Sequence, residues 1–347
     1  MTLAVRYTAA RTLDTAQVEP SEPGPGEVLL APAFVGICGT DLHIFHGDMD
    51  ARVAAPAVIG HEMSGRIVQV GAGVEGWQPG DAVTVMPLRW DGTCPACRAG
   101  HQHVCQNLDF IGIDSPGAMQ QRWTVPAATL IRLPESLALD HAALLEPTAV
   151  AVHDVGRAGV RAGERVVVVG GGPVGVLIAL VARAAGADVR VVELSAHRRR
   201  IAEELGLTAW SPADEDVPAL VREWTGDAGA EVAFEVSGAA GGVDTAVEVL
   251  GVRGRLCLVA IHARPREVNL HRFFWRELTL VGARLYDRGD FERAVTLVAD
   301  GTIPAERLIS KVVPLTEAPA AFEALEGGGD VMKILVDCTD DSQGASA

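Results

Sequence analysis

Two short segments of the sequence carry side chains suited to binding a transition metal. Cys38 opens the segment CGTDLHIF, and His61 lies in GHE, directly before Glu62. A thiolate and an imidazole suit Zn²⁺, and a catalytic zinc usually keeps three protein ligands and one open position for water or substrate. The sequence therefore predicts an open catalytic zinc site. Its third ligand is Glu62 or Glu146 of LLEPTAVAVH, bound directly or through water.

The cysteines give a second sign of metal binding. The chain has six cysteines in 347 residues, too few for a disulfide scaffold. Three of them, Cys94, Cys97 and Cys105, have the spacing C-x2-C-x7-C within twelve residues. This clustering fits metal ligation better than disulfide bonding, and His101 and His103 lie in the same loop as further candidate ligands.

A glycine-rich segment, RVVVVGGGPVG, predicts a dinucleotide-binding turn. Gly170, Gly172 and Gly175 form the G-x-G-x-x-G pattern between a β-rich run and an apolar helical pattern. Such glycines let the backbone approach a pyrophosphate, which lies at the N-terminus of the next helix. The residues expected to hold it are Gly170, Gly172, Pro173, Val174 and Gly175.

An acidic residue further along the chain indicates which dinucleotide is bound. Glu193 lies eighteen residues after Gly175, where a carboxylate accepts hydrogen bonds from the adenosine ribose. Because this charge repels a 2′-phosphate, NAD is preferred over NADP, although Arg198 and its neighbours Arg199 and Arg200 lie close behind. Arg198 is included among the cofactor-binding residues.

Two later strand ends are candidates for the nicotinamide path. Ser237 in FEVSG, and Ala260 with Ile261 in LVAIH, end successive apolar runs, on the side where open α/β sheets bind ligands. His262 could reach the same cleft, but the sequence assigns it no role.

The elements that must position these residues change character along the chain. Residues 1–140 contain short β-type segments separated by Gly and Pro, typical of an all-β, barrel-like domain. From about residue 141, helical and β-type patterns alternate, which predicts a parallel sheet with helices on both faces. The fold class is therefore β plus doubly wound α/β.

Composition limits the partners. The chain has 29 basic and 45 acidic residues, a formal charge of −16, so nucleic acid is not expected to bind. No apolar stretch of membrane-spanning length and no signal segment are evident, which predicts a cytoplasmic protein without membrane association.

Several motifs occur in the order found in one known family. CGTDLHIF, GHEMSG, WQPGDAV, the cysteine cluster, LLEPTAVAVH and VVVVGGGPVG make the chain resemble the zinc-dependent medium-chain dehydrogenase/reductase family over nearly its whole length. The resemblance implies a GroES-like catalytic domain at 1–145, a Rossmann NAD-binding domain at 146–285, and a return to the catalytic domain at 286–347. It also implies a homodimer or homotetramer.

The resemblance also implies roles for residues of the catalytic site. Cys38 and His61 match zinc ligands, and Glu146 falls where polyol dehydrogenases carry a glutamate, with Glu62 expected to enter or leave the shell. Thr40 and His43 match a hydroxyl and a histidine that pass the alcohol proton to solvent.

The same family carries four cysteines around a structural zinc, and this chain departs from that pattern. Asp91 replaces the first cysteine, so the expected site is a Cys3Asp set of Asp91, Cys94, Cys97 and Cys105. A carboxylate oxygen can bind zinc, but it should hold the ion less tightly than a thiolate.

The function expected from these residues is hydride transfer between NAD and a small alcohol or the matching ketone. The segment CGTDLHI and the glutamate at 146 make the chain resemble the polyol, butanediol and threonine dehydrogenase branch of the family, which implies a secondary alcohol, vicinal diol or polyol as substrate. A threonine-type amino-alcohol dehydrogenase is one alternative, and a zinc-free enoyl or quinone reductase on the same fold is another.

Overall fold

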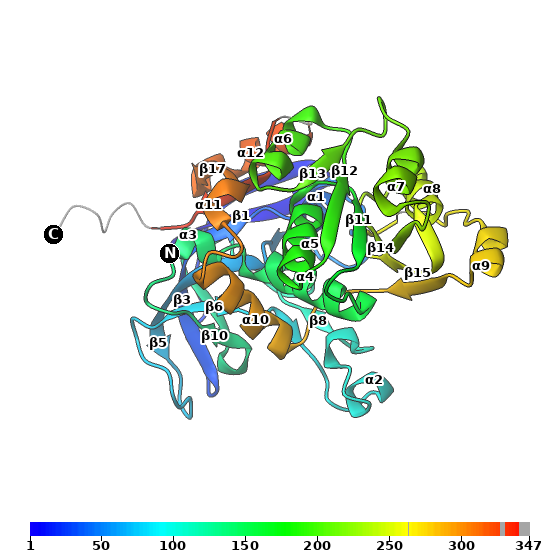
Figure 1. The fold of residues 1–347 in the computed structure, drawn as a ribbon. Helices are drawn as coiled ribbons and strands as arrows, with labels where there is room; N and C mark the ends of the chain where they lie inside the picture. The colour runs from blue at the N-terminus through cyan, green and yellow to red at the C-terminus, as the bar shows by residue number, and fades with distance from the viewer. Residues whose placement is uncertain (263, 327–329, 340–347) are drawn as a thin grey trace. The chain divides into compact units, whose positions relative to one another are not determined.

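The chain divides into two compact units. The computed structural model describes residues 1–262, 264–326 and 330–339 (Figure 1). The first unit comprises Met1–Glu146, Val295–Ala299 and the described residues from Ile309 onward, and the second comprises Pro147–Ala294 and Asp300–Leu308. The predicted segment 286–347 is thus shared between both units. A β-sheet unit and a doubly wound α/β unit confirm the predicted fold class.

Long apolar strands build the first unit. β3 (Glu27–Gly36) pairs antiparallel with both β5 (Glu62–Val70) and β18 (Lys333–Asp337) near the centre of a seven-stranded sheet. In this register Gly36 faces Glu62 and Leu335. The end of β3, the start of β5 and the start of β18 therefore meet, although they are far apart in the sequence.

The other elements of the first unit are short. Its remaining strands are β1 (Thr2–Ala9), β2 (Thr12–Val18), β4 (Ala57–Val58), β6 (Ala82–Val85), β7 (Leu88–Arg89), β8 (Asp109–Phe110), β9 (Trp123–Pro126), β10 (Leu130–Arg132) and β17 (Ile309–Pro314). Its helices are α1 (Gly39–His46), α2 (Pro95–Arg98), α3 (Leu139–Ala142) and α12 (Ala318–Glu326), with 3-10 turns at Gln102–Val104, Ala127–Thr129 and Leu315–Glu317. α4 (Leu145–Ala158) leads into the second unit.

The second unit is a six-stranded parallel sheet in the order β13-β12-β11-β14-β15-β16. Its strands are β11 (Arg165–Val169), β12 (Asp188–Val192), β13 (Thr208–Trp210), β14 (Ala230–Glu235), β15 (Leu250–Leu258) and β16 (Thr279–Gly282). The four valines of β11 are buried, as expected for a central strand covered on both faces. The strand order reverses between β11 and β14, which marks the ligand-binding edge of such a sheet.

Helices join the parallel strands and pack on the sheet. α5 (Pro173–Ala184) lies against β11 and β12, whereas α8 (Ala240–Glu248) lies against β14 (Figure 1). The remaining helices are α6 (Ala196–Glu204), α7 (Val217–Thr225), α9 (Leu270–Arg276), α10 (Arg288–Ala299) and α11 (Ala305–Leu308). Among the described residues, no helix combines the length and apolar character needed to cross a bilayer.

Candidate active site

Cys38, His61 and Glu62 come together at the junction of β3, β5 and α1. Each offers one donor atom to a metal, and the three donor atoms lie within 4.8 Å of one another. The pairing of Gly36 with Glu62 explains the proximity, because Cys38 follows β3 by two residues and His61 immediately precedes β5. His61 and Glu62 are buried and Cys38 is half-buried. Sulfur, nitrogen and carboxylate oxygen form a donor set that fits zinc.

Asp41 supports two members of this cluster. It is fully buried in the first turn of α1 and accepts the Cys38 N–H at 2.9 Å, and its other oxygen lies 3.5 Å from His61 Nδ1. Burial lowers the pKa of His61, but Asp41 and the Cys38 sulfur outweigh it and hold that pKa above its ordinary value. A carboxylate at Nδ1 orients the ring and leaves Nε2 for a metal.

Lys333 is a member of the site that the sequence analysis missed. Its ammonium forms an ion pair with Glu62 Oε2 and donates to the Ile37 carbonyl at 3.1 Å, and it is almost completely buried. Burial lowers the pKa of Lys333, but the charges of Glu62 and Cys38 outweigh it and raise that pKa. A single lysine at the start of the apolar run KILVD was the available signal.

Three further residues were predicted for this site: Glu146, Thr40 and His43. Glu146 is buried in the first turn of α4 and is not among the donor atoms within 4.8 Å. Thr40 and His43 lie one turn apart on α1, and His43 Nδ1 lies 3.1 Å from Asp48 Oδ2. The proton path through them stays a prediction.

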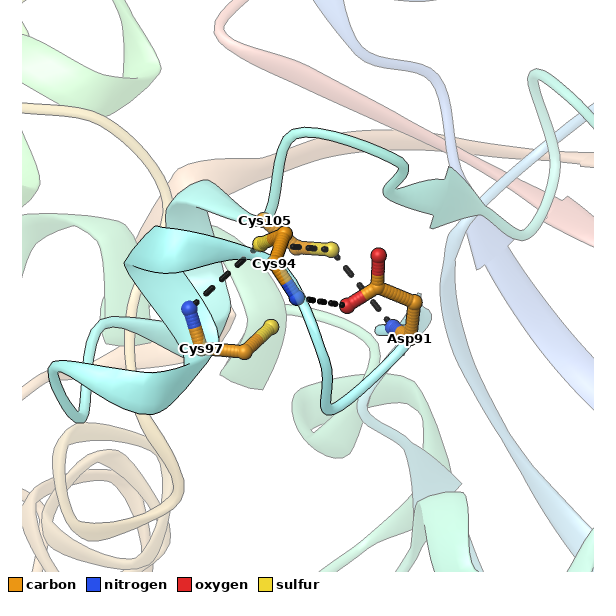
Figure 2. Close-up of side chains that lie close together, drawn as sticks. All are labelled: Asp91, Cys94, Cys97 and Cys105. Carbon is orange, nitrogen blue, oxygen red and sulfur yellow. Dashed lines mark hydrogen bonds between the residues drawn. The ribbon is translucent and has the colours of Figure 1, made fainter.

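The second predicted cluster is formed by Asp91, Cys94, Cys97 and Cys105 (Figure 2). Their donor atoms lie within 4.8 Å of one another in the loop around α2, and the three cysteines are buried. The sulfurs of Cys94 and Cys105 are 3.8 Å apart. Tetrahedral zinc with Zn–S bonds of ~2.3 Å requires a sulfur separation of ~3.8 Å, so this spacing fits the ion.

Hydrogen bonds in this loop favour the charged forms of Cys94 and Asp91, whereas burial disfavours that of Cys97. Cys94 Sγ accepts from the N–H groups of Cys97 and Gln106, each at 3.4 Å, and these bonds lower the pKa of Cys94. Burial raises the pKa of Cys97 to about 12. The Cys94 N–H, together with Asn107 and Thr93, holds the pKa of Asp91 below its usual range.

The glycine-rich turn adopts the geometry that the sequence predicts. Gly170 has a φ of +108°, and a Cβ on Gly175 would lie 1.8 Å from the Gly170 carbonyl oxygen, so neither position tolerates a side chain easily. Gly172 caps α5, and Pro173 occupies its first turn. The amide end of α5 therefore opens beside a close-packed loop, which fits a pyrophosphate.

Glu193 lies directly beside this loop. One of its carboxylate oxygens accepts the Gly171 N–H and the other accepts the Ser195 N–H, both at 2.7 Å. Arg199 donates to the carbonyl oxygen of Glu193, whereas the Arg198 guanidinium lies near Gly172. Ser237 and Gly238 follow β14, and Ala260 and Ile261 follow β15, at the same edge of the sheet.

Two family models and several known proteins match the chain. The family model described as the alcohol dehydrogenase GroES-like domain matches residues 24–135, and that described as zinc-binding dehydrogenase matches residues 173–300. The chain is 47% identical to 2-dehydro-3-deoxy-L-galactonate 5-dehydrogenase of Pseudoalteromonas atlantica, over 96% of this chain and 98% of that protein. It is 32% identical to L-galactonate-5-dehydrogenase of Escherichia coli, over 87% and 88%.

Solved structures give a similar result. The 2R,3R-butanediol dehydrogenase of Bacillus subtilis superimposes with a TM-score of 0.90 at 31% identity, over 97% of this chain and 99% of that one. A zinc-binding dehydrogenase of Sinorhizobium meliloti, solved with NADP, gives a TM-score of 0.90 at 32% identity, over 97% and 99%.

Proposed function

We propose that this chain, which belongs to the zinc-dependent medium-chain dehydrogenase family, oxidises a secondary hydroxyl of a sugar acid, or reduces the matching ketone, with NAD(H). Membership of this family makes it an alcohol-type oxidoreductase. The observation that carries the reaction is the meeting of Cys38, His61 and Glu62 in one buried cluster.

These residues would hold the catalytic zinc. Cys38 and His61 would supply two ligands and Glu62 the third, while Glu146 would act through water or replace Glu62. When bound, zinc supplies a Lewis acid that makes an alcohol easier to deprotonate. Lys333 compensates the Glu62 charge in a buried setting, and Asp41 fixes the His61 ring.

The proton released from the alcohol needs a route to solvent. Thr40 begins that route with a hydroxyl that both accepts and donates, and His43 ends it with an imidazole that can take up and release a proton. The His43 ring is partly exposed and is oriented by Asp48, which suits exchange with water.

NAD is the proposed acceptor, held by the turn at Gly170–Gly175 and by Glu193. The Glu193 carboxylate is anchored by two backbone N–H groups at the position of the adenosine ribose, and its charge disfavours a 2′-phosphate. Arg198 lies close enough to this loop to contact the adenosine side of the cofactor.

The substrate class rests on the relatives. Two of them are named for oxidation at C5 of a galactonate-type acid, and the more similar is 47% identical over nearly the whole chain. The test is NADH formation with 2-dehydro-3-deoxy-L-galactonate, L-galactonate, sorbitol and L-threonine, before and after verified zinc removal. We expect a sugar acid to give the highest kcat/KM and chelation to abolish it. Turnover that survives zinc removal would support a zinc-free reductase instead.

A threonine-type activity is the second candidate. L-threonine 3-dehydrogenase of Pyrococcus abyssi is 35% identical over 81% of this chain, so the substrate panel must include threonine. A kcat/KM for threonine above that of every sugar acid and polyol would replace the leading proposal.

A homodimer or homotetramer is proposed from an exposed apolar surface. Leu270, Phe274 and Trp275 of α9 are largely exposed, and β16 is an edge strand of the parallel sheet. An unpaired edge beside apolar side chains favours pairing with a second copy. Trp275→Glu should shift the mass measured by light scattering toward the monomer.

The six free cysteines are consistent with a reducing, cytoplasmic compartment.

A further inference from the structure

The topology of the second unit indicates where the nicotinamide half of the cofactor must lie. Glu193 follows β12, and the phosphate-binding turn follows β11. With the adenosine on the β12 side of that turn, the dinucleotide extends in the opposite direction, over the ends of β14 and β15. The loops after these two strands therefore decide how the nicotinamide is held.

One buried carboxylate connects both loops. Glu235, the last residue of β14, is fully buried, and its Oε1 accepts the Ser237 N–H at 2.9 Å, the Ser237 hydroxyl at 2.5 Å and the Gly238 N–H at 3.0 Å. Its backbone carbonyl accepts the N–H groups of Val259 and Ala260. Ser237 also contacts the phosphate-binding turn, because a Cβ on Gly170 would lie 2.9 Å from the Ser237 nitrogen.

His262 closes this network from the second loop. His262 Nε2 lies 2.9 Å from Glu235 Oε2, and Arg266 Nε donates to His262 Nδ1 at 3.4 Å. Since Nδ1 accepts, Nε2 carries the proton and donates to Glu235. Arg266 also donates to the Gly238 carbonyl at 3.3 Å. The result is a closed ring of contacts through Glu235, His262, Arg266 and Gly238.

The network is also tightly packed. A Cβ on Gly242 of α8 would lie 2.1 Å from the Ser237 hydroxyl and 2.8 Å from Glu235 Oε1. The loop after β14 therefore has little room to move away from Glu235, and the loop after β15 is attached to the same carboxylate.

We propose that Glu235 and His262 are positioning residues that fix the loops after β14 and β15 against the nicotinamide of bound NAD(H). The inference rests on the proposed function, because it requires the chain to bind a nicotinamide dinucleotide. Neither residue is assigned contact with the reacting atoms. Glu235 holds the backbone N–H groups of Ser237, Gly238 and Ala260, and His262 acts through Glu235.

The experiment compares two ligands that differ only in the nicotinamide. Binding of NADH and of ADP-ribose is measured by calorimetry for the wild type, His262→Leu and His262→Gln. We expect His262→Leu to bind NADH about tenfold more weakly, because the Glu235 carboxylate loses a buried donor, and to bind ADP-ribose as the wild type does. Gln can still donate to Glu235, so His262→Gln should recover most of the NADH affinity.

A matched control is available on the same strand. Glu231 lies at the opposite end of β14 and pairs with Arg165 at 2.6 Å, so Glu231→Gln breaks an ion pair of this strand away from the ligand edge. It should leave the NADH to ADP-ribose affinity ratio unchanged. An unchanged ratio in His262→Leu, whether both affinities stay or fall together, would overturn the inference. A wild type that binds neither ligand would instead reject the proposed function, and the inference with it.

Discussion

The two metal-type clusters of this chain differ in how the sequence builds them. Asp91, Cys94, Cys97 and Cys105 belong to one loop of fifteen residues and are held by hydrogen bonds within that loop (Figure 2). Cys38 follows β3 and the adjacent pair His61 and Glu62 lies at the start of β5, and Lys333 of β18, near the other end of the chain, places a buried cation beside Glu62. The first cluster is local and thiolate-rich. The second depends on long-range strand pairing.

This difference indicates which cluster supports the fold and which supports the reaction. The local cluster contains three sulfurs and a carboxylate, which together would complete a closed tetrahedron. The distributed cluster contains three mixed donors, which would leave a position for substrate. The local cluster should therefore hold a structural ion whose loss is tolerated by the reaction, and the distributed cluster should hold the ion on which turnover depends.

The largest expected effect is on turnover when the distributed cluster loses its thiolate. Cys38→Ser should lower kcat by ~1,000-fold, because Lewis-acid stabilisation by zinc contributes several kcal/mol to the reaction. The zinc content should fall by about one ion per chain. NADH binding should be nearly unchanged. Steady-state kinetics with zinc analysis checks this. Cys257→Ala, a buried cysteine of β15 outside both clusters, serves as the control and should keep both zinc and turnover.

The second prediction concerns the buried ion pair between Lys333 and Glu62. Lys333→Met should lower the free energy of unfolding by ~3–5 kcal/mol, because it leaves the Glu62 carboxylate buried without its cation. The double variant Lys333→Met with Glu62→Gln should recover most of this stability but not the activity. Denaturant unfolding measures the first effect. If the double variant is no more stable than Lys333→Met, the ion pair is not the cause.

A third prediction uses a buried carboxyl that has no such cation. Both oxygens of Asp154 lack a hydrogen-bond partner among the described residues, and burial raises its pKa to about 7, with Asp290 raising it further and His153 opposing. The protonated Asp154 is favoured in the folded state, so this group adds to the free energy of unfolding at low pH. That contribution is lost as the pH rises from about 4 to about 7, and the free energy of unfolding falls by up to ~4 kcal/mol.

Asp154→Asn removes that proton equilibrium. The melting temperature of the wild type should fall relative to that of Asp154→Asn between pH 5 and pH 8, with the two closest at the lower pH. Differential scanning calorimetry at both values checks this. A difference that is independent of pH would show that Asp154 does not titrate in this range.

The smallest effect on turnover is expected in the local cluster. Asp91→Asn keeps the hydrogen bonds to Thr93 and Cys94 but removes the negative ligand. The rate of zinc release from this loop should rise at least ~10-fold, while kcat stays nearly unchanged. Release of zinc to a chromogenic chelator measures the first, and initial rates measure the second. A large loss of turnover would show that the lobe takes part in the reaction.

The sequence predicted the local features better than the distributed ones, for a physical reason. The cysteine loop and the turn at Gly170–Gly175 are contiguous, so residue type and spacing define them. Lys333 reaches Glu62 only because β18 and β5 both pair with β3, and no local pattern shows that register. Glu235 was missed similarly, because its partner His262 lies in the loop after the neighbouring strand β15.

The zinc site illustrates the same limit. Cys38 and His61 were predicted from their types and motifs, and the structure brings them together with Glu62. The preference for Glu146 as third ligand came from resemblance, and its place in the ligand set stays a prediction. The sequence alone does not distinguish Glu62, which follows a ligand histidine, from Glu146, which lies at the start of a helix. Only the packing of the folded chain decides which carboxylate oxygen faces the metal.

The central claim is that the distributed cluster holds the zinc required for hydride transfer. Anomalous diffraction at the zinc edge, from crystals of the active enzyme grown with NADH, tests it most directly. We predict one peak between Cys38 and His61 and another in the loop of Cys94, Cys97 and Cys105. An active enzyme with zinc only in the cysteine loop, or with none, would contradict this account.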